Sequence, residues 1–174
     1  MTIIADQFVV FDLETTGFSP NDNEIIEIGA IKVDATERET FQLLVRPRNG
    51  IPSKITQITG ISQPMVDESG TDIDSAIEQF VAFIGDYRLV AYNADFDMRF
   101  ISAAGSRMGV TIGNDYACAL KMARRAWPKL PNYKLSTLAR LGGLTATGAH
   151  RALKDCELTE FVYTSAVAVL GSVK

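Results

Sequence analysis

Residues 7–13 read QFVVFDL, a short apolar run whose sixth residue is an aspartate. A run of this length, rich in valine and phenylalanine and followed by the turn-forming residues 15–22, predicts a buried β-strand that leads into a loop. Segments 24–33 and 40–46 also have strand composition, and a polar turn separates them as in an antiparallel meander. The chain therefore begins with three strands, the first of which belongs in the core.

The remainder of the chain alternates between helix and strand patterns. Such alternation after an opening meander predicts an α/β fold, a mixed five-stranded sheet flanked by helices, and no linker divides residues 1–174. In the last helix we expect Leu158, Phe161, Val162 and Val169 to face inward. Strand patterns cover 88–92 and 115–118; helical patterns cover a short turn in 53–61, a helix capped by Asp72 and running to 84, and 95–108, 119–126, 135–141 and 151–170.

The composition excludes several classes of protein. Of the 174 residues, 47% are apolar and 22% are charged, a balance that excludes a disordered chain. No apolar run approaches the ~20 residues of a membrane span, and residues 1–7 lack the features of a signal peptide. We therefore expect a soluble, cytoplasmic protein without membrane contact. Its two cysteines, Cys118 and Cys156, are too few for a thiolate metal site and are expected to be reduced and structural.

Positive charge is concentrated in one segment. Residues 117–154 contain eight basic residues and no acidic one, so the other nine basic and 21 acidic residues leave the rest of the chain at −12 and the whole at −4. A basic segment in an acidic protein indicates a face that meets a polyanion. Two helices with solvated lysine and arginine side chains explain the charge equally well.

Two carboxylates stand at the end of the first strand. Asp12 and Glu14 are two residues apart, so both side chains point to the same face of the strand. Two like charges there are unfavourable without a cation between them, because burial and repulsion both oppose ionisation. The pair therefore indicates a metal site; the structural alternative is a solvated Glu14 beside an Asp12 that caps a turn.

A third carboxylate, Asp97, falls on the apolar face of the expected helix 95–108. Phe100, Ile101 and Ala104 follow it at plus three, four and seven. The structural alternative is a first-turn carboxylate that interacts with the helix dipole. Because Asp95 fits that capping role better, Asp97 is interpreted as a functional residue.

The remaining signal is the pair His150 and Asp155 at the last helix. Asp155 has Leu158 and Val162 at plus three and plus seven, which places it on the inward stripe. His150 is the only histidine, and a lone histidine is more often structural than catalytic. Four carboxylates from three segments accompany it, however, and histidine is the side-chain type that exchanges protons near neutral pH. We therefore interpret His150 as a functional residue.

Oxygen ligands of this kind suit Mg²⁺ or Mn²⁺ rather than zinc, which recruits histidine and cysteine. Two such ions ~4 Å apart bind both the attacking and the leaving oxygen of a phosphodiester, and a neutral imidazole accepts the proton of the attacking water. The set therefore predicts phosphodiester hydrolysis.

Three blocks, FDLETTG at 11–17, YNADFDMRF at 92–100 and HRALKDC at 150–156, resemble in order the motifs of the DEDDh branch of the DnaQ-like 3′-5′ exonuclease superfamily. The resemblance covers nearly the whole chain. It implies a ribonuclease H-like fold and one exonuclease domain over 1–174, with a role in DNA repair or proofreading. It also implies two Mg²⁺ or Mn²⁺ ions held by Asp12, Glu14, Asp97 and Asp155, with Asp12 bridging and His150 as general base.

The same resemblance implies residues that grip the terminal nucleotide. Thr59 and Tyr92 stand where histidines are often found in the family, so a contact to base or phosphate differs there. Segment 121–131 (KMARRAWPKLP) is similar to small exodeoxyribonucleases of the superfamily. The implied substrate-binding residues are Thr15, Thr16, Phe18, Ile58, Thr59, Ile61 and Asn93.

The leading hypothesis is a metal-dependent exonuclease that releases nucleoside 5′-monophosphates from single-stranded 3′ ends, with DNA preferred over RNA. An exoribonuclease of the same fold is the first alternative. A phosphatase that begins with D-x-D is disfavoured because the motif here is D-x-E. A non-catalytic nucleic-acid-binding module is the alternative from another class; it would have lost a metal ligand or the base, and none of these residues is missing. The end of the chain at Lys174 favours a stand-alone nuclease, and polymerase association remains open.

Overall fold

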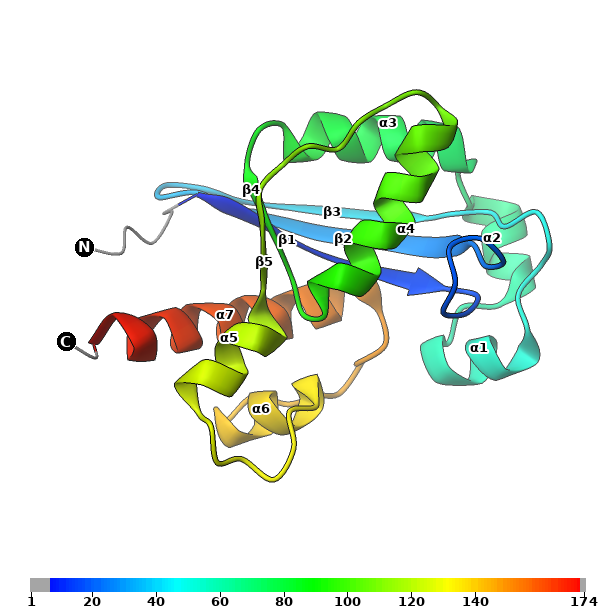
Figure 1. Cartoon of the computed structure of the whole chain (residues 1–174). Coiled ribbons are helices and arrows are strands. Elements are labelled where there is room, and N and C mark those ends of the chain that lie inside the picture. Colours follow the sequence, from blue (N-terminus) through cyan, green and yellow to red (C-terminus); the bar gives the residue numbers. More distant parts are fainter. Residues whose placement is uncertain (1–6, 173–174) are drawn as a thin grey trace.

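The computed structural model describes residues 7–172, which form a five-stranded mixed sheet with helices on both faces (Figure 1). The strand order is β3-β2-β1-β4-β5. The pairs β1–β2 and β2–β3 are antiparallel, and the pairs β1–β4 and β4–β5 are parallel. The predicted opening meander and fold class are therefore confirmed. The strands are β1 (Phe8–Thr15), β2 (Ile25–Val33), β3 (Arg38–Leu44), β4 (Arg88–Ala91) and β5 (Tyr116–Cys118).

Helices α3 and α4 cover one face of the sheet, and α7 covers the other together with α5 and α6 (Figure 1). Helix α2 was not predicted, because its two apolar residues, Met65 and Val66, are adjacent and show no helical repeat; Pro64 near its start favours helix initiation. The helices are α1 (Ser53–Thr59), α2 (Gln63–Ser69), α3 (Ile73–Ile84), α4 (Ala94–Arg107), α5 (Ala119–Ala126), α6 (Leu135–Leu141) and α7 (Ala152–Ser172).

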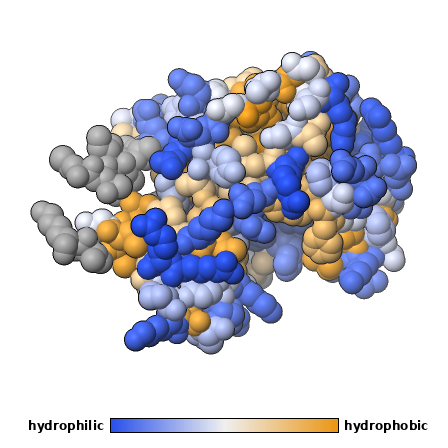
Figure 2. All heavy atoms as spheres, in the orientation of Figure 1, coloured by the Kyte–Doolittle hydropathy of each residue, from blue (hydrophilic) through white to orange (hydrophobic). Residues whose placement is uncertain are grey.

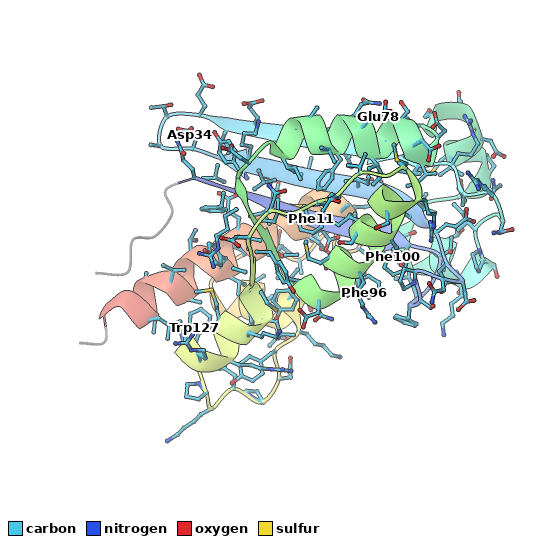
Figure 3. All side chains as sticks on the ribbon, turned by 45° about the horizontal axis from the view of Figure 1, so that its top comes forward. Phe11, Asp34, Glu78, Phe96, Phe100 and Trp127 are labelled. Atoms are coloured by element: carbon cyan, nitrogen blue, oxygen red, sulfur yellow. The ribbon has the colours of Figure 1, made fainter. Side chains whose placement is uncertain are left out.

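Strand β1 separates two cores because its side chains alternate between the faces of the sheet. Val9 and Phe11 pack into the cluster beneath α3 and α4, where Figure 3 shows Phe11 between the sheet and the helices. Phe8 and Val10 pack on the opposite face against α7. By the same alternation Asp12 and Glu14 point toward the α7 face, at the end of the strand where the apolar contacts stop.

Two local predictions were wrong. Asp95 does not cap α4: Asn93 is the N-cap residue, and the Asp95 carboxylate forms an ion pair with Lys121 at 2.8 Å. Val169 does not face inward, since its side chain is 36% exposed; α7 extends beyond the sheet there and its inward stripe ends. Cys118 and Cys156 are both free and buried, as expected. Among the described residues, no helix has the length and apolar character needed to cross a membrane.

Candidate metal centre

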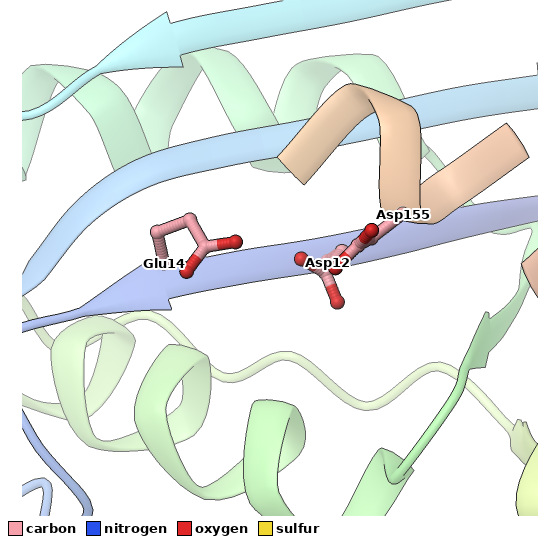
Figure 4. Close-up of side chains that lie close together, drawn as sticks. All are labelled: Asp12, Glu14 and Asp155. Atoms are coloured by element: carbon pink, nitrogen blue, oxygen red, sulfur yellow. The ribbon is translucent and has the colours of Figure 1, made fainter. Parts of the chain in front are cut away.

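Three carboxylates from the two ends of the chain converge at the end of β1. Asp12 and Glu14 come from β1 and Asp155 from the first turn of α7, and one oxygen of each lies within 4.8 Å of the others (Figure 4). Neither the Asp12 nor the Glu14 carboxylate accepts a hydrogen bond from another residue in the 7–172 range, so their lone pairs are available to a cation. The structure thus brings together three of the four predicted carboxylates.

Asp97 lies beside this cluster but is not one of the three converging groups. Its side chain is 4% exposed, and its Oδ1 atom accepts a hydrogen bond from the backbone N–H of Leu13 at 3.3 Å. The Leu13 N–H has no partner on β4, because β4 pairs with β1 only as far as Val10. The end of β1 is therefore open to α4. Asp97 therefore contacts, from α4, the backbone of Leu13, which is the residue between Asp12 and Glu14.

The cluster is strongly biased against simultaneous ionisation. Burial, followed by repulsion from Asp97 and Glu14, raises the pKa of Asp12 well above its usual range. Burial and then Asp155 raise the pKa of Glu14 to about 8, and burial raises the pKa of Asp97 to about 7 despite the Leu13 hydrogen bond. A divalent cation removes both penalties, because it supplies the missing positive charge. With oxygen as the only donor, the set fits a hard cation such as Mg²⁺ or Mn²⁺.

His150 lies in the exposed segment that leads into α7. Its backbone N–H donates to both oxygens of Asp155 at 3.3 Å, which helps to orient that carboxylate. Its φ of +67° is the only positive value at a non-glycine residue in the part of the chain that the structure describes. The imidazole is exposed, so it is accessible to a substrate, and its role as base remains a prediction.

Glu27 is the site residue that sequence reasoning missed. It lies on β2 directly opposite Glu14 and is fully buried, and its carboxylate pairs with Arg151 at 2.7 Å. The signal was present, because a glutamate between Ile26 and Ile28 in a buried strand is costly without a partner. The partner itself lies 124 residues away, and no local pattern identifies it.

Some of the residues predicted to contact the terminal nucleotide are exposed, and the others form contacts within the fold. Phe18 is 87% exposed in the loop after β1 and Ile58 is 46% exposed on α1, and Figure 1 shows this loop and α1 at the same end of the molecule. Asn93 is also exposed, beside the start of α4. These three side chains are free to contact a ligand.

The remaining members of the group serve the fold. The Thr59 hydroxyl donates to the Ile55 carbonyl and accepts from the Ile61 N–H, and Ile61 is fully buried. Thr15 donates to the Gly17 carbonyl, and Thr16 accepts from the Glu24 N–H. Where the sequence departs at Tyr92, the phenol donates to the Tyr133 carbonyl, which makes this residue a structural one.

Comparison with known proteins identifies relatives of the whole arrangement. The model of the family described as Exonuclease matches residues 9–163. A PolC-type DNA polymerase III of Clostridium perfringens is 41% identical over 88% of this chain, which spans only 11% of that relative. The DNA polymerase III subunit epsilon of Aquifex aeolicus is 36% identical over 90% of this chain and 78% of its own length.

A solved structure shares both fold and extent. Exonuclease X in complex with 5′-overhanging duplex DNA superposes with a TM-score of 0.77 at 26% sequence identity, covering 94% of this chain and 93% of that one. The five-stranded sheet and its flanking helices thus match an exonuclease structure over nearly the full length of both chains.

Proposed function

Because the chain belongs to the exonuclease family, we propose that it is a metal-dependent 3′-5′ exonuclease that releases nucleoside 5′-monophosphates from single-stranded DNA. The observation that carries the proposal is the convergence of Asp12, Glu14 and Asp155 within 4.8 Å. We further propose that residues 1–174 act as one nuclease domain. Its proposed setting is DNA repair or proofreading in the cytoplasm, in line with the polymerase III relatives.

In the proposed mechanism, Asp12, Glu14 and Asp155 would hold two Mg²⁺ or Mn²⁺ ions, and Asp97 would complete the acidic set from α4. Metal ions held there would supply Lewis acidity to the phosphodiester and its leaving oxygen. His150 accepts the proton of the attacking water, whose oxygen forms a bond to the last phosphorus. The bond from that phosphorus to the 3′ oxygen of the preceding nucleotide breaks, and this oxygen is protonated.

The exposed apolar side chains near the cluster provide the proposed grip on the terminal nucleotide. Phe18 and Ile58 offer faces on which a base can pack, and such stacking tolerates any base. Asn93 supplies a polar contact beside Asp97. The structure of Exonuclease X with DNA supports DNA as the substrate class.

A basic surface over α5, α6 and the segment between them is the proposed track for the rest of the strand. Only Lys121 among its exposed cations pairs with a carboxylate, Asp95, in the 7–172 range. Both helices pack on α7, the helix that carries Asp155. Figure 2 shows hydrophilic side chains gathered over this part of the molecule. The basic surface consists of Lys121, Arg124, Arg125, Lys129, Lys134 and Arg140.

The test is degradation of single-stranded DNA and a matched RNA, each labelled at the 5′ end, with Mg²⁺, Mn²⁺ or EDTA. The proposal predicts a metal-dependent ladder that shortens from the 3′ end, faster on DNA. Faster degradation of RNA would favour the exoribonuclease alternative. Binding of both oligonucleotides without degradation would favour a non-catalytic binding module. An Asp12→Asn variant purified in parallel excludes a contaminating nuclease.

A further inference from the structure

The Glu27 carboxylate is the anchor of the segment that carries His150 and Asp155. It accepts hydrogen bonds from Arg151 Nη2 at 2.7 Å, from Arg151 Nε at 3.2 Å and from the backbone N–H of Ala152 at 2.9 Å. Gln42 on β3 donates a further bond at 2.9 Å. A fully buried carboxylate is stable only when it is satisfied in this way, so each of these groups is held in place.

The anchored residues lie directly beside the metal centre. Arg151 follows His150, and its carbonyl accepts the backbone N–H of Asp155 at 3.0 Å. His150 has a backbone conformation that non-glycine residues rarely adopt, and such a conformation persists only when its surroundings fix it. Glu27 also faces Glu14 across the β1–β2 pair. The ion pair between the buried Glu27 and the partly exposed Arg151 thus joins β2 to the start of α7, beside the place where the carboxylates meet.

We propose that Glu27 and Arg151 are positioning residues, which hold His150 and Asp155 in register with Asp12 and Glu14. The inference rests on the proposed nuclease function and adds two residues to it. Neither residue needs to touch the substrate, because they act through the backbone of the segment that begins α7. The alternative is that the pair only docks α7 on the sheet.

The chain offers a matched control for the docking alternative. Arg38 on β3 and Glu160 on α7 also join the helix to the sheet, with an ion pair at 2.9 Å that is partly exposed. Glu160 lies five residues beyond Asp155 on α7, and Arg38 pairs with Val33, at the other end of β2 from Glu27. A variant of Glu160 therefore weakens helix docking without disturbing the metal centre.

The experiment compares Arg151→Met, Arg151→Lys, Glu27→Gln and the double variant Glu27→Gln with Arg151→Met against Glu160→Gln. Activity is expressed per folded molecule, with folding checked by circular dichroism and thermal unfolding. We expect kcat to fall on the order of 10²-fold in Arg151→Met with little change in KM, since small misplacements of catalytic groups have effects of this size. Arg151→Lys should recover part of this loss, and the double variant should be no worse than the single ones, because the pair acts as a unit.

Binding of Mn²⁺, measured by calorimetry, gives a second readout that does not need turnover. It should weaken severalfold in Arg151→Met and remain unchanged in Glu160→Gln. A kcat and Mn²⁺ affinity within twofold of the wild type in folded Arg151→Met would overturn the positioning role. A wild-type protein that binds Mn²⁺ but degrades no nucleic acid would instead overturn the nuclease, while the Mn²⁺ comparison still decides whether the pair positions Asp155.

Discussion

Asp12 carries the greatest electrostatic cost in the site, since burial, Asp97, Glu14 and Asp155 all oppose its ionisation. Asp12→Asn removes this charge with almost no change of shape. We expect it to abolish turnover and to raise the stability of the metal-free protein by about 1 kcal/mol, or roughly 2–4 °C in Tm. Thermal unfolding in EDTA, beside nuclease assays, measures both effects. Asp86→Asn, at an exposed loop position, is the control; near-normal activity of Asp12→Asn would contradict the metal-centre assignment.

His150 allows a cleaner substitution than alanine. Its φ is +67°, and asparagine tolerates this region better than most residues, so His150→Asn should preserve the backbone while removing the base. The rate is expected to fall by about 10² to 10⁴, with Mn²⁺ affinity unchanged. Single-turnover kinetics and calorimetry test the two parts. Loss of Mn²⁺ binding would make His150 a metal ligand rather than a base.

At the scale of elements, β2 and α7 are in unusually close contact at Gly29. A Cβ atom there would lie 2.5 Å from the backbone nitrogen of Leu153 and 2.6 Å from the carbonyl carbon of Ala152. Gly29→Ala therefore requires the start of α7 to move, and we expect a loss of about 1–3 kcal/mol in unfolding free energy together with weaker Mn²⁺ binding. Urea unfolding measures the first. Gly113→Ala, where the new Cβ meets nothing within 4 Å, should leave both properties unchanged.

The sequence predicted helices and strands well where the local pattern of residues was sufficient. It predicted the role of a side chain poorly where that role depends on a partner far away in the sequence. Because side chains alternate along a strand, the two-residue spacing of Asp12 and Glu14 placed them on one face, as the structure has them. Helix α2 was missed because its two adjacent apolar residues show no helical period, and Asp95 was assigned to a cap because its partner Lys121 lies 26 residues away. Glu27 illustrates the same limit within the site. A glutamate in a buried strand indicates an energetic cost of burying its charge, but only the tertiary structure identifies its partner Arg151.

For the molecule as a whole, the acidic centre predicts a pH dependence of stability. The pKa values of Glu14 and Asp97, about 8 and about 7, exceed the ~4 of the unfolded chain. The folded state therefore binds more protons between these limits, so the stability of the metal-free protein should decrease as the pH rises from about 4 to about 8. Mg²⁺ binds the ionised carboxylates, so it should stabilise the protein more at pH 8 than at pH 5. Urea unfolding in EDTA and in Mg²⁺ tests both signs; a rise in EDTA would contradict them.

The basic surface makes a separate prediction about salt. If the bound single-stranded DNA follows α5, Arg125→Gln should reduce the slope of log DNA affinity against log salt concentration by about 0.7. Arg88→Gln is the matched control, because Arg88 pairs with Phe8 at the opposite end of β1 from the carboxylates. Fluorescence anisotropy with the Asp12→Asn protein measures binding without degradation. Equal slopes in the two variants would contradict this track.

The convergence of Asp12 and Asp155 also has a consequence for biosynthesis. The two residues are 143 positions apart, and a nascent chain that has left the ribosome only as far as α6 carries the β1 and α4 carboxylates of the proposed metal centre without Asp155. Until α7 emerges and packs on the sheet, Asp12 and Glu14 lack Asp155, the third of the three converging carboxylates. The three-carboxylate cluster therefore forms only once α7 has been synthesised and has packed on the sheet, so the proposed metal centre is assembled after the rest of the sheet and its first helices.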